Sequence, residues 1–372
     1  MKLLRNSTET AKGVMAINGV PGIGEPTRLI RWLDSHGVPG AEQLRGIELV
    51  AGGRSNLTYR LDFGPAAGAG PARRLVLRRP PLGHVLPTAH DMSREYRVLS
   101  ALRGTDVPVP APVTFCPDSD VVGAPFYVMQ YVDGLVLRTD KDGEKITSRQ
   151  ASEISECLAQ TLAAIHAVDI AAVGLVGFGR PAGYLARQLK RWQRQWELSA
   201  TRELPCYDQL VSRLAQGLPA ASEGTLVHGD FRLDNLLIRL DPRPSVAAVV
   251  DWEMSTLGDP LADLGLTLAY WTDPGDTERL GLALAGAITS RPGFATSAGF
   301  ARRYAELTGR DVSGIGYYVA FGTFKLAVVL EGIHARFLQN KTVGEGFDQA
   351  GSGVPMLIER ANRTLDGLAE DL

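Results

Sequence analysis

The sequence predicts an α+β protein of two lobes, the first built mainly from antiparallel strands and the second larger and mostly helical. Two observations predict this class. Between residues 47 and 131 apolar residues alternate with polar neighbours in several short runs, as on half-buried strands, with one helical stretch inserted. Beyond Gly134 apolar residues instead recur every three or four positions, as on amphipathic helices. One short connector joins the two patterns, so we expect two lobes linked there.

The lobe boundaries follow from where these patterns change. Residues 1–20 contain basic residues but no apolar stretch followed by a cleavage site, so they predict a disordered leader rather than a signal peptide. Residues 21–132 form the first lobe, with a nucleotide-binding role, and residues 133–372 form the second lobe, with the catalytic loop and the acceptor site. No apolar run approaches the length needed to span a bilayer.

Composition and charge exclude several classes of function. Of the 372 residues 45% are hydrophobic, which is enough for a sizeable core. The net charge of -2 does not favour nucleic acid or an anionic membrane as a partner. Cys116, Cys157 and Cys206 are odd in number and far apart, as expected of reduced thiols. These features predict a cytoplasmic enzyme.

The first lobe is predicted to begin with a helix, because Leu29, Ile30 and Leu33 lie at helical spacing. The strands are marked by alternation and the turns by glycine and proline. We expect a helix over 25–36, a hairpin whose second strand is 57–63, a strand over 75–77, a helix over 91–102, and two further strands ending at 126–131.

The second lobe is predicted to be helical around a short β segment. Residues 154–165 and 184–198 have the periodicity of long amphipathic helices. Short strands flank the segment 227–251, and the remainder is helical with glycine and proline breaks. The segment 227–251 also carries the strongest chemical signal in the sequence.

That signal is the run His-Gly-Asp-Phe-Arg-Leu-Asp-Asn over 228–235, followed by Asp251 after the apolar run 246–250. Phosphoryl transfer needs a carboxylate to orient the attacking hydroxyl and magnesium to neutralise the phosphates. Asp230 supplies the carboxylate, and Asn235 and Asp251 are oxygen ligands suited to Mg²⁺. Each residue alone could be a cap or turn residue, but the joint spacing favours the chemical interpretation.

These motifs resemble those of the aminoglycoside phosphotransferase/choline kinase-like superfamily, which implies a bilobal protein-kinase-like fold and the use of ATP. The runs over 76–81, 86–90 and 94–96 are most similar to the kinase-like domains associated with acyl-CoA dehydrogenases. That resemblance implies phosphorylation of a hydroxyacyl-CoA, typically a 4-hydroxy acid thioester, and a functional pairing with an acyl-CoA dehydrogenase.

The resemblance also assigns roles residue by residue. It implies that Asp230 is the catalytic base and that Asn235 and Asp251 bind magnesium. It implies that Asp263 braces the loop through the backbone around His228, whose side chain orients the loop rather than transferring protons.

Three residues keep two interpretations each. Arg232 is placed to bring positive charge to the transferred phosphoryl group, or it forms a surface salt bridge. Asp259 and Asp263, close to Pro260, either brace the loop or cap a helix.

The tip of the first hairpin occupies the place of a nucleotide-covering loop. Glycine lets backbone amides approach phosphate oxygens, and a serine hydroxyl adds a donor. A hairpin turn with two glycines is the plainer interpretation. The nucleotide-binding residues expected here are Gly52, Gly53, Arg54, Ser55 and Asn56.

On the third strand, where kinases carry lysine, this chain has Arg78 followed by Arg79. Strand alternation sends the two side chains to opposite faces, and alignment on Val76 and Leu77 selects Arg78 for the nucleotide. Its guanidinium could bridge phosphate and the carboxylate of Glu95. A solvated strand cation is the alternative.

The connector after residue 128 is expected to read adenine. One carbonyl and one amide of an extended segment match a purine edge, and Gln130 and Val132 provide them, with Met129 at the back of the pocket. An ordinary edge strand is the alternative.

Three hypotheses for the function remain open. A basic and aromatic helix over 184–196 suits an anionic, adenine-bearing acceptor such as CoA, although a solvated charged face is common. Aminoglycoside, choline or another amino alcohol is the second hypothesis and calls for acidic residues instead. A catalytically inactive nucleotide-binding scaffold is the third, which the intact Asp230, Asn235 and Asp251 oppose.

Overall fold

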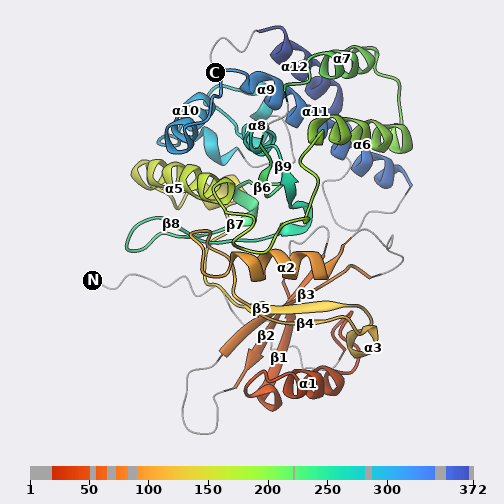
Figure 1. Ribbon diagram of the computed structural model, residues 1–372, viewed down its shortest axis with the longest axis vertical. Coiled ribbons are helices and arrows are strands. Elements are labelled where there is room, and N and C mark those ends of the chain that lie inside the picture. The colour runs from red at the N-terminus through yellow and green to blue at the C-terminus, as the bar shows by residue number, and fades with distance from the viewer. Residues whose placement is uncertain are drawn as a thin grey trace. The chain divides into compact units, whose positions relative to one another are not determined.

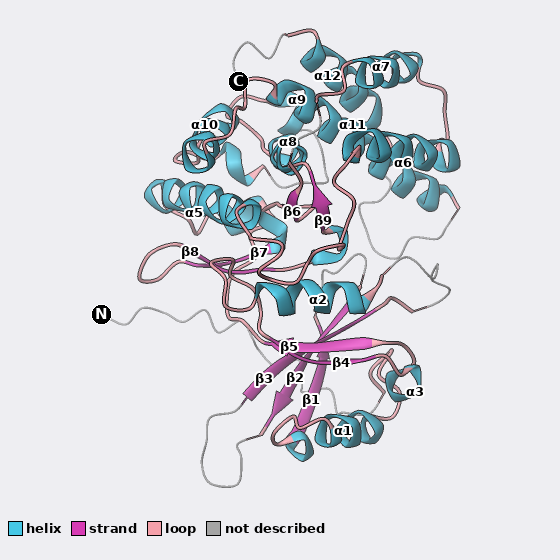
Figure 2. Cartoon of the chain, viewed as in Figure 1, coloured by secondary structure: helices cyan, strands magenta, loops and turns pink. Residues whose placement is uncertain are grey.

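The computed structural model describes residues 19–50, 56–64, 73–82, 90–220, 223–280, 287–339 and 349–367. The chain separates into two compact units, one made of Met1–Arg103 and Pro110–Val132 and the other of Gly104–Val109 and Asp133–Leu372. The first unit contains the five-stranded sheet and the second is mostly helical, which confirms the α+β class (Figure 2). Residues 104–109 belong to the helical unit, not the first lobe as expected, because Pro108 O accepts a hydrogen bond from Val249 N at 2.7 Å.

The first unit is an antiparallel sheet of five strands in the order β1-β2-β3-β5-β4 (Figure 1). The alternation in the sequence explains its buried face, since Tyr59, Leu61 and Phe63 of one strand all point into the core. The strands are β1 (Leu44–Leu49), β2 (Leu57–Phe63), β3 (Arg73–Arg79), β4 (Pro112–Cys116) and β5 (Phe126–Gln130).

Helices and one short 3₁₀ turn accompany the sheet among the described residues of this unit. The apolar stripe of the first helix, including Leu29 and Leu33, joins the core formed by the strands. Helix α2 begins after Asp91, whose carboxylate accepts hydrogen bonds from the first-turn amides. The bounds are α1 (Pro26–Ser35), η1 (Ala41–Gln43), α2 (Met92–Leu102) and α3 (Ser119–Val122).

The second unit is organised around α11 (Ile315–Leu338), which packs against α8 (Pro260–Tyr270), α12 (Val354–Leu365) and α6 (Tyr184–Ser199). Two short antiparallel ribbons carry the segment with the chemical motifs. They pair β6 (Thr225–Val227) with β9 (Thr256–Gly258), and β7 (Leu236–Arg239) with β8 (Ser245–Val249). The other elements are α4 (Asp140–Gly143), α5 (Ser148–His166), α7 (Pro205–Gln216), η2 (Leu233–Asn235), η3 (Trp252–Met254), α9 (Thr277–Leu280), η4 (Ile288–Ser290) and α10 (Ser297–Thr308).

Helix α11 corrects one expectation from the sequence. It is long and apolar enough to cross a membrane, although no run of that length was expected. In the structure 72% of its most apolar window is buried inside the protein, against α8, α12 and α6. Its hydrophobicity is therefore that of a central core helix.

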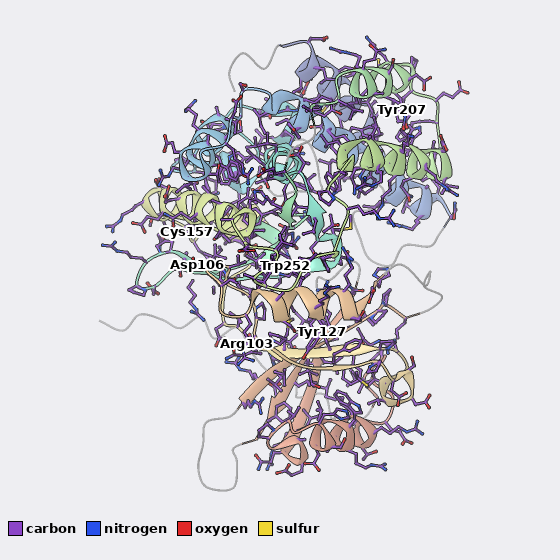
Figure 3. The ribbon with its side chains drawn as sticks, viewed as in Figure 1. Arg103, Asp106, Tyr127, Cys157, Tyr207 and Trp252 are labelled. Atoms are coloured by element: carbon purple, nitrogen blue, oxygen red, sulfur yellow. The ribbon has the colours of Figure 1, made fainter. Side chains whose placement is uncertain are left out.

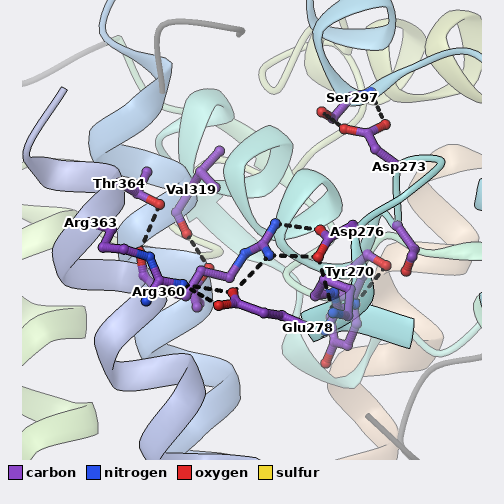
Figure 4. A network of polar contacts seen from close by, with 12 residues as sticks. Tyr270, Asp273, Asp276, Glu278, Ser297, Val319, Arg360, Arg363 and Thr364 are labelled. Carbon is purple, nitrogen blue, oxygen red and sulfur yellow. Dashed lines mark hydrogen bonds and ion pairs between the residues drawn. The ribbon is translucent and has the colours of Figure 1, made fainter. Parts of the chain in front are cut away.

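Ion pairs tie α12 to the short helix α9 and the residue before it (Figure 4). Arg360 Nη2 lies 2.6 Å from Asp276 Oδ2, and Arg363 Nη2 lies 2.7 Å from Glu278 Oε1. These pairs fasten the last described helix to the chain that follows α8.

Candidate functional site

The loop over 228–235, called the HGD loop below, follows β6 directly. Gly229 has φ +83°, which side-chain-bearing residues rarely adopt. A Cβ at this position would lie 2.6 Å from Met254 O, so the loop backbone can approach that segment only as glycine.

Asp263 from α8 grips the HGD loop, as the resemblance implied. Its Oδ2 accepts the backbone N–H of His228 at 2.6 Å, and its Oδ1 accepts that of Gly229 at 2.8 Å. Burial alone would raise the pKa of Asp263, but the hydrogen bond from His166 and the neighbouring His228 outweigh it and hold the pKa below its ordinary value. The carboxylate is therefore a buried, charged anchor.

Of the two interpretations of Asp259, the structure supports helix capping. Its Oδ1 accepts the N–H of Leu261 at 3.0 Å at the start of α8, and its Oδ2 accepts the hydroxyl of Tyr318 at 3.0 Å. It holds α8, and α8 in turn places Asp263.

His228 orients the loop through its ring. Nδ1 accepts the N–H of Asp230 at 3.2 Å, and Nε2 donates to Val250 O at 3.1 Å. The ring also packs 4.7 Å from that of Trp252, which is labelled in Figure 3. With one nitrogen accepting and the other donating, the imidazole links the loop to the segment before Asp251.

Asp230 has two side-chain partners inside its own loop. Asn235 Nδ2 donates to Asp230 Oδ2 at 3.0 Å and to its backbone oxygen at 2.9 Å. Arg232 Nε lies 3.3 Å from Asp230 Oδ2, and Arg232 Nη1 lies 3.0 Å from Asp234 Oδ2. The sequence had not anticipated that Arg232 pairs with Asp230 itself.

The charge on Arg232 is fixed by these neighbours. Burial would lower its pKa, but Asp230, Tyr270 and Asp234 outweigh burial and raise it. The guanidinium also stacks 4.8 Å from the centre of the Tyr270 ring. A permanent cation therefore lies directly beside the carboxylate of Asp230.

The two expected magnesium ligands are linked by the backbone. Val250 N donates to Asn235 O at 2.9 Å, so the residue before Asp251 is bonded to Asn235. Asp251 has φ +68°, a strained conformation for a residue with a side chain. Because the Asn235 amide nitrogen is engaged by Asp230, its side-chain oxygen is the atom suited to a cation.

Among the described residues no group of three or more His, Cys, Asp or Glu gathers to hold a metal ion. A pair of one amide and one carboxylate fits Mg²⁺, which takes one or two protein oxygens and fills its octahedron with water and phosphates. The residues present fit that ion better than a dedicated structural metal.

In the first unit Arg78 pairs with Glu95, as the strand register predicts. Arg78 Nε lies 3.0 Å from Glu95 Oε2, and both side chains are buried. Two further residues hold the carboxylate: Asn56 Nδ2 donates to Oε1 at 2.9 Å, and the Tyr127 hydroxyl donates to Oε2 at 3.0 Å. Tyr127, labelled in Figure 3, was missed because a single tyrosine on a buried strand has no distinctive local pattern.

Asn56 was expected to bind nucleotide, and its side chain has another role here. It is 2% exposed, with Nδ2 on Glu95 and Oδ1 bonded to His90 Nδ1 at 2.8 Å. It therefore supports the ion pair through its bond to Glu95 and is itself held by His90. The other expected residues of the tip, Gly52, Gly53, Arg54 and Ser55, lie outside the described residues.

Arg79 points to the face opposite Arg78, also as predicted. Its side chain is buried rather than exposed to solvent. It is 4% exposed and its guanidinium donates to Val122 O at 2.6 Å, to Pro80 O at 3.1 Å and to Gly22 O. Arg79 thus joins the chain before α1 to the end of α3.

Some backbone groups of the connector already form hydrogen bonds within the first unit. Met129 is buried, whereas the Gln130 side chain is exposed. The N–H of Gln130 donates to Ala111 O at 2.8 Å. Only the carbonyl of Gln130 could then meet an adenine amino group, with the N–H of Val132 as its companion.

The basic and aromatic face expected on α6 is divided in the structure. Trp192 and Trp196 are 8% and 6% exposed, and Trp196 stacks on Tyr207 at 4.4 Å between ring centres. The cations Lys190 and Arg194 are exposed on the other side of the helix. The tryptophans are core residues, so the expectation of a mixed surface for stacking adenine is wrong.

Lys325 also contacts the HGD loop and was not expected from the sequence. From α11 its Nζ donates to Gly229 O at 2.7 Å and lies 5.3 Å from the centre of the Trp192 ring. Burial lowers the pKa of Lys325, while Asp230 and Asp263 oppose that shift. The available signal was a lysine within the apolar run 318–330, which contains no other charged residue.

Comparison with known proteins agrees with this arrangement. Residues 46–300 match the family described as "Phosphotransferase enzyme family". Acyl-CoA dehydrogenase family member 10 from Mus musculus is 35% identical over 312 residues, which is 83% of this chain. The chain spans 28% of the length of that curated relative.

Solved structures share the fold. A candidate aminoglycoside phosphotransferase from Ralstonia eutropha aligns with a TM-score of 0.76 and 33% identity, covering 92% of this chain and 98% of that one. Choline kinase from Cryptosporidium parvum aligns with a TM-score of 0.62 at 12% identity, covering 93% and 97%, which is a likeness of fold alone. Because the family match takes in both the Arg78–Glu95 pair and the HGD loop, the chain belongs to the phosphotransferase enzyme family and is a small-molecule phosphotransferase.

Proposed function

We propose that this phosphotransferase moves the γ-phosphate of ATP to the hydroxyl of a small molecule, with a hydroxyacyl-CoA of the 4-hydroxy acid type as the favoured acceptor. The observation that carries the proposal is the carboxylate of Asp230, held from within its loop by Asn235 and Arg232 while Asp263 fixes the loop backbone. A carboxylate positioned in this way is the group that phosphoryl transfer to an alcohol requires.

In this proposal Asp230 accepts the hydroxyl proton and aligns the oxygen with the phosphorus. Transfer to an alcohol makes an O–P bond to the acceptor and breaks the bond between the γ-phosphorus and the ADP oxygen. Arg232, a permanent cation beside Asp230, stabilises the negative charge that develops on the transferred group. No covalent bond to the protein is needed.

Asn235 and Asp251 would hold Mg²⁺, which when bound neutralises phosphate charge. The chain's own contribution is to keep these two ligands together through the hydrogen bond between Val250 N and Asn235 O. Asp251 is preset by its left-handed backbone, so little ordering remains when a cation arrives.

The first unit would bind the nucleotide. Arg78, held by Glu95, would contact the phosphates, and Gly52 to Ser55 would cover them. The backbone of Gln130 and Val132 would read adenine beside Met129. Arginine in place of lysine keeps the charge and adds a forked geometry that suits phosphate oxygens.

We favour an acyl-CoA acceptor over an aminoglycoside, choline or another amino alcohol. Arg232 is already paired with Asp230 and Asp234, and Lys325 bonds to Gly229 O, so the charges around the HGD loop are balanced within the protein. The name of the mouse relative supports an acyl-CoA thioester and a functional pairing with an acyl-CoA dehydrogenase. An inactive scaffold is disfavoured because Asp230, Asn235 and Asp251 are all present.

The test is transfer by wild-type and Asp230→Asn enzyme with MgATP and a 4-hydroxyacyl-CoA, followed by mass spectrometry of the phosphorylated product. We expect wild-type enzyme to form it and the variant to lose about 10²- to 10⁴-fold in kcat, because the hydroxyl loses its proton acceptor. Asp208→Asn, at an exposed position in α7, is the matched control. A variant within about tenfold of wild type would remove Asp230 from this role.

A further inference from the structure

Lys325 is an ammonium group set in a long, apolar and mostly buried helix, α11. Its neighbours Phe324 and Leu326 are buried, and α11 packs on three other helices. Burying an ammonium costs several kcal/mol unless partners compensate it. Leucine or methionine would fill this position better if packing were its only role. The presence of a charged residue therefore indicates a further role.

The contacts of Lys325 lead to the peptide that carries Asp230. Its Nζ donates to Gly229 O at 2.7 Å, and the amide of the same peptide unit, the N–H of Asp230, donates to His228 Nδ1 at 3.2 Å. Both polar ends of this peptide are therefore bonded, and its plane cannot rotate. The direction in which the Asp230 side chain leaves the backbone depends on that plane.

Lys325 acts together with Asp263 on successive peptides of the loop. Asp263 accepts the N–H groups of His228 and Gly229, and Lys325 donates to the carbonyl of Gly229. A carboxylate from α8 and an ammonium from α11 thus hold the backbone on either side of Gly229. Each charge is paired with the end of the peptide dipole that it attracts.

The packing of α8 on α11 sets the two charges at this separation. A Cβ on Gly322 would lie 2.9 Å from Gly265 O, and one on Gly265 would lie 2.4 Å from the Tyr318 backbone. The two helices therefore meet backbone to backbone. Gly265 is two residues after Asp263, and Gly322 is three residues before Lys325, so this contact fixes both side chains.

The ring of Trp192 completes the environment of the ammonium. It lies 5.3 Å from Nζ and comes from α6, where it is itself buried. An aromatic face compensates part of the desolvation of a cation without competing for its hydrogen bonds. The contact with the ring does not use the N–H group that Lys325 donates to Gly229 O.

We propose that Lys325 is a positioning residue of the transfer reaction, whose hydrogen bond to Gly229 O fixes the peptide plane from which Asp230 reaches the acceptor hydroxyl. The inference rests on the proposed function of Asp230. It adds a residue 96 positions away in the sequence to the machinery of the HGD loop.

The test compares Lys325→Met with Lys141→Met, an exposed lysine in α4, as the matched control. Methionine keeps the apolar stem and removes both charge and donor. Two quantities are measured: ADP release from MgATP with a 4-hydroxyacyl-CoA, and the midpoint of thermal unfolding. We expect kcat to fall about 10- to 100-fold, since a small misplacement of a reacting group costs that much. The KM for ATP should change less than about twofold.

Lys325→Arg separates positioning from a structural role. Removing the donor leaves the partly buried Gly229 O without this hydrogen bond, which destabilises the folded state, so Lys325→Met should have a lower unfolding midpoint than wild type. Kinetics are therefore measured well below that midpoint, where both proteins are folded. Lys325→Arg, which keeps charge and donor, should recover kcat in part. A Lys325→Arg variant that regains the wild-type midpoint but not kcat would overturn the proposal.

The two proposals can fail separately. If Lys325→Met keeps wild-type kcat while Asp230→Asn is inactive, the proposed function stands and the inference about Lys325 is wrong. If wild-type protein transfers no phosphate to the acceptor, ADP release with water as the acceptor still reports on the loop. Unchanged ADP release in Lys325→Met would then reject the inference on its own.

Discussion

Adjacent residues of one strand have different tasks in this protein. Arg78 and Arg79 are both buried, yet Arg78 binds a carboxylate and Arg79 binds backbone carbonyls. The alternation of a β-strand separates them onto two faces. We therefore expect replacement by alanine to reduce activity at Arg78 and to reduce stability at Arg79.

We predict that Arg78→Ala raises KM for ATP and lowers kcat, because the lost charge acts on the phosphates in both ground and transition states. Arg79→Ala should instead lower the unfolding midpoint by several degrees, since the carbonyls of Gly22 and Val122 lose their donor. Steady-state kinetics and thermal unfolding of both variants check this. A crippled Arg79→Ala that is as stable as wild type would contradict the assignment.

Arg78→Lys tests whether charge alone is enough. Lysine keeps the charge but cannot contact Glu95 and phosphate with one planar fork. We therefore expect partial recovery of kcat relative to Arg78→Ala, and full recovery would show that the site needs only a cation.

At the scale of elements, α8 is the support of the HGD loop. Its first turn is capped by Asp259, and one turn later Asp263 reaches the loop backbone. This arrangement makes the stability of the second unit depend on the ionisation of one buried carboxylate.

We predict that Asp263→Asn lowers the free energy of unfolding by about 2 kcal/mol at neutral pH, because charge-assisted hydrogen bonds to two amides are lost. The folded-state pKa of Asp263 lies below its unfolded value of about 3.9. Its stabilisation is thus fully present above pH 4 and is lost as pH falls through the lower folded-state pKa. Denaturant titrations between pH 3 and 7 should show the difference between wild type and variant shrinking below about pH 4. A pH-independent difference would contradict this account.

The strands and helices were predictable because their signals are local. The alternation of Tyr59, Leu61 and Phe63 and the helical spacing of Leu29 and Leu33 each lie within one element, and both match the burial observed. The membrane-length apolarity of α11 was missed, since a lysine interrupts the run.

The candidate site was predictable from spacing alone only where its residues share a short segment. The contacts of Arg78 with Glu95 and of Asp263 with the loop were instead expected through the resemblance of the motifs. The spacing of Asp230 and Asn235 survives as a direct hydrogen bond. The contact between Lys325 and Gly229 spans 96 residues, and no local pattern announces it. The carbonyl partners of Arg79 are equally invisible, because any residue type can supply a backbone oxygen.

At the scale of the whole molecule, binding of MgATP should appear as added stability, because a ligand that binds only the folded state shifts the unfolding equilibrium. At about 100 times its Kd, MgATP should contribute about 2.7 kcal/mol to wild-type protein. Asp251→Asn should lose the magnesium-dependent part of this gain.

Asparagine is the appropriate change at this position, because it tolerates the left-handed backbone of Asp251 whereas alanine does not. The unfolding midpoint without ligand should therefore stay close to that of wild type. Calorimetric titration of ATP with and without magnesium provides the measurement, and Asp208→Asn is again the exposed control. Undiminished magnesium-dependent affinity in Asp251→Asn would reject it as a ligand.

The long sequence separations around the HGD loop also have a consequence for synthesis on the ribosome. Asp263 follows Gly229 by 34 residues, and Lys325 follows it by 96. At about 5–20 residues per second, Lys325 is added about 5–20 s after Gly229. A nascent chain that has reached only α8 already contains the whole HGD motif but lacks one of its two charged supports. The site is therefore completed only when α11 has emerged and closed on α8.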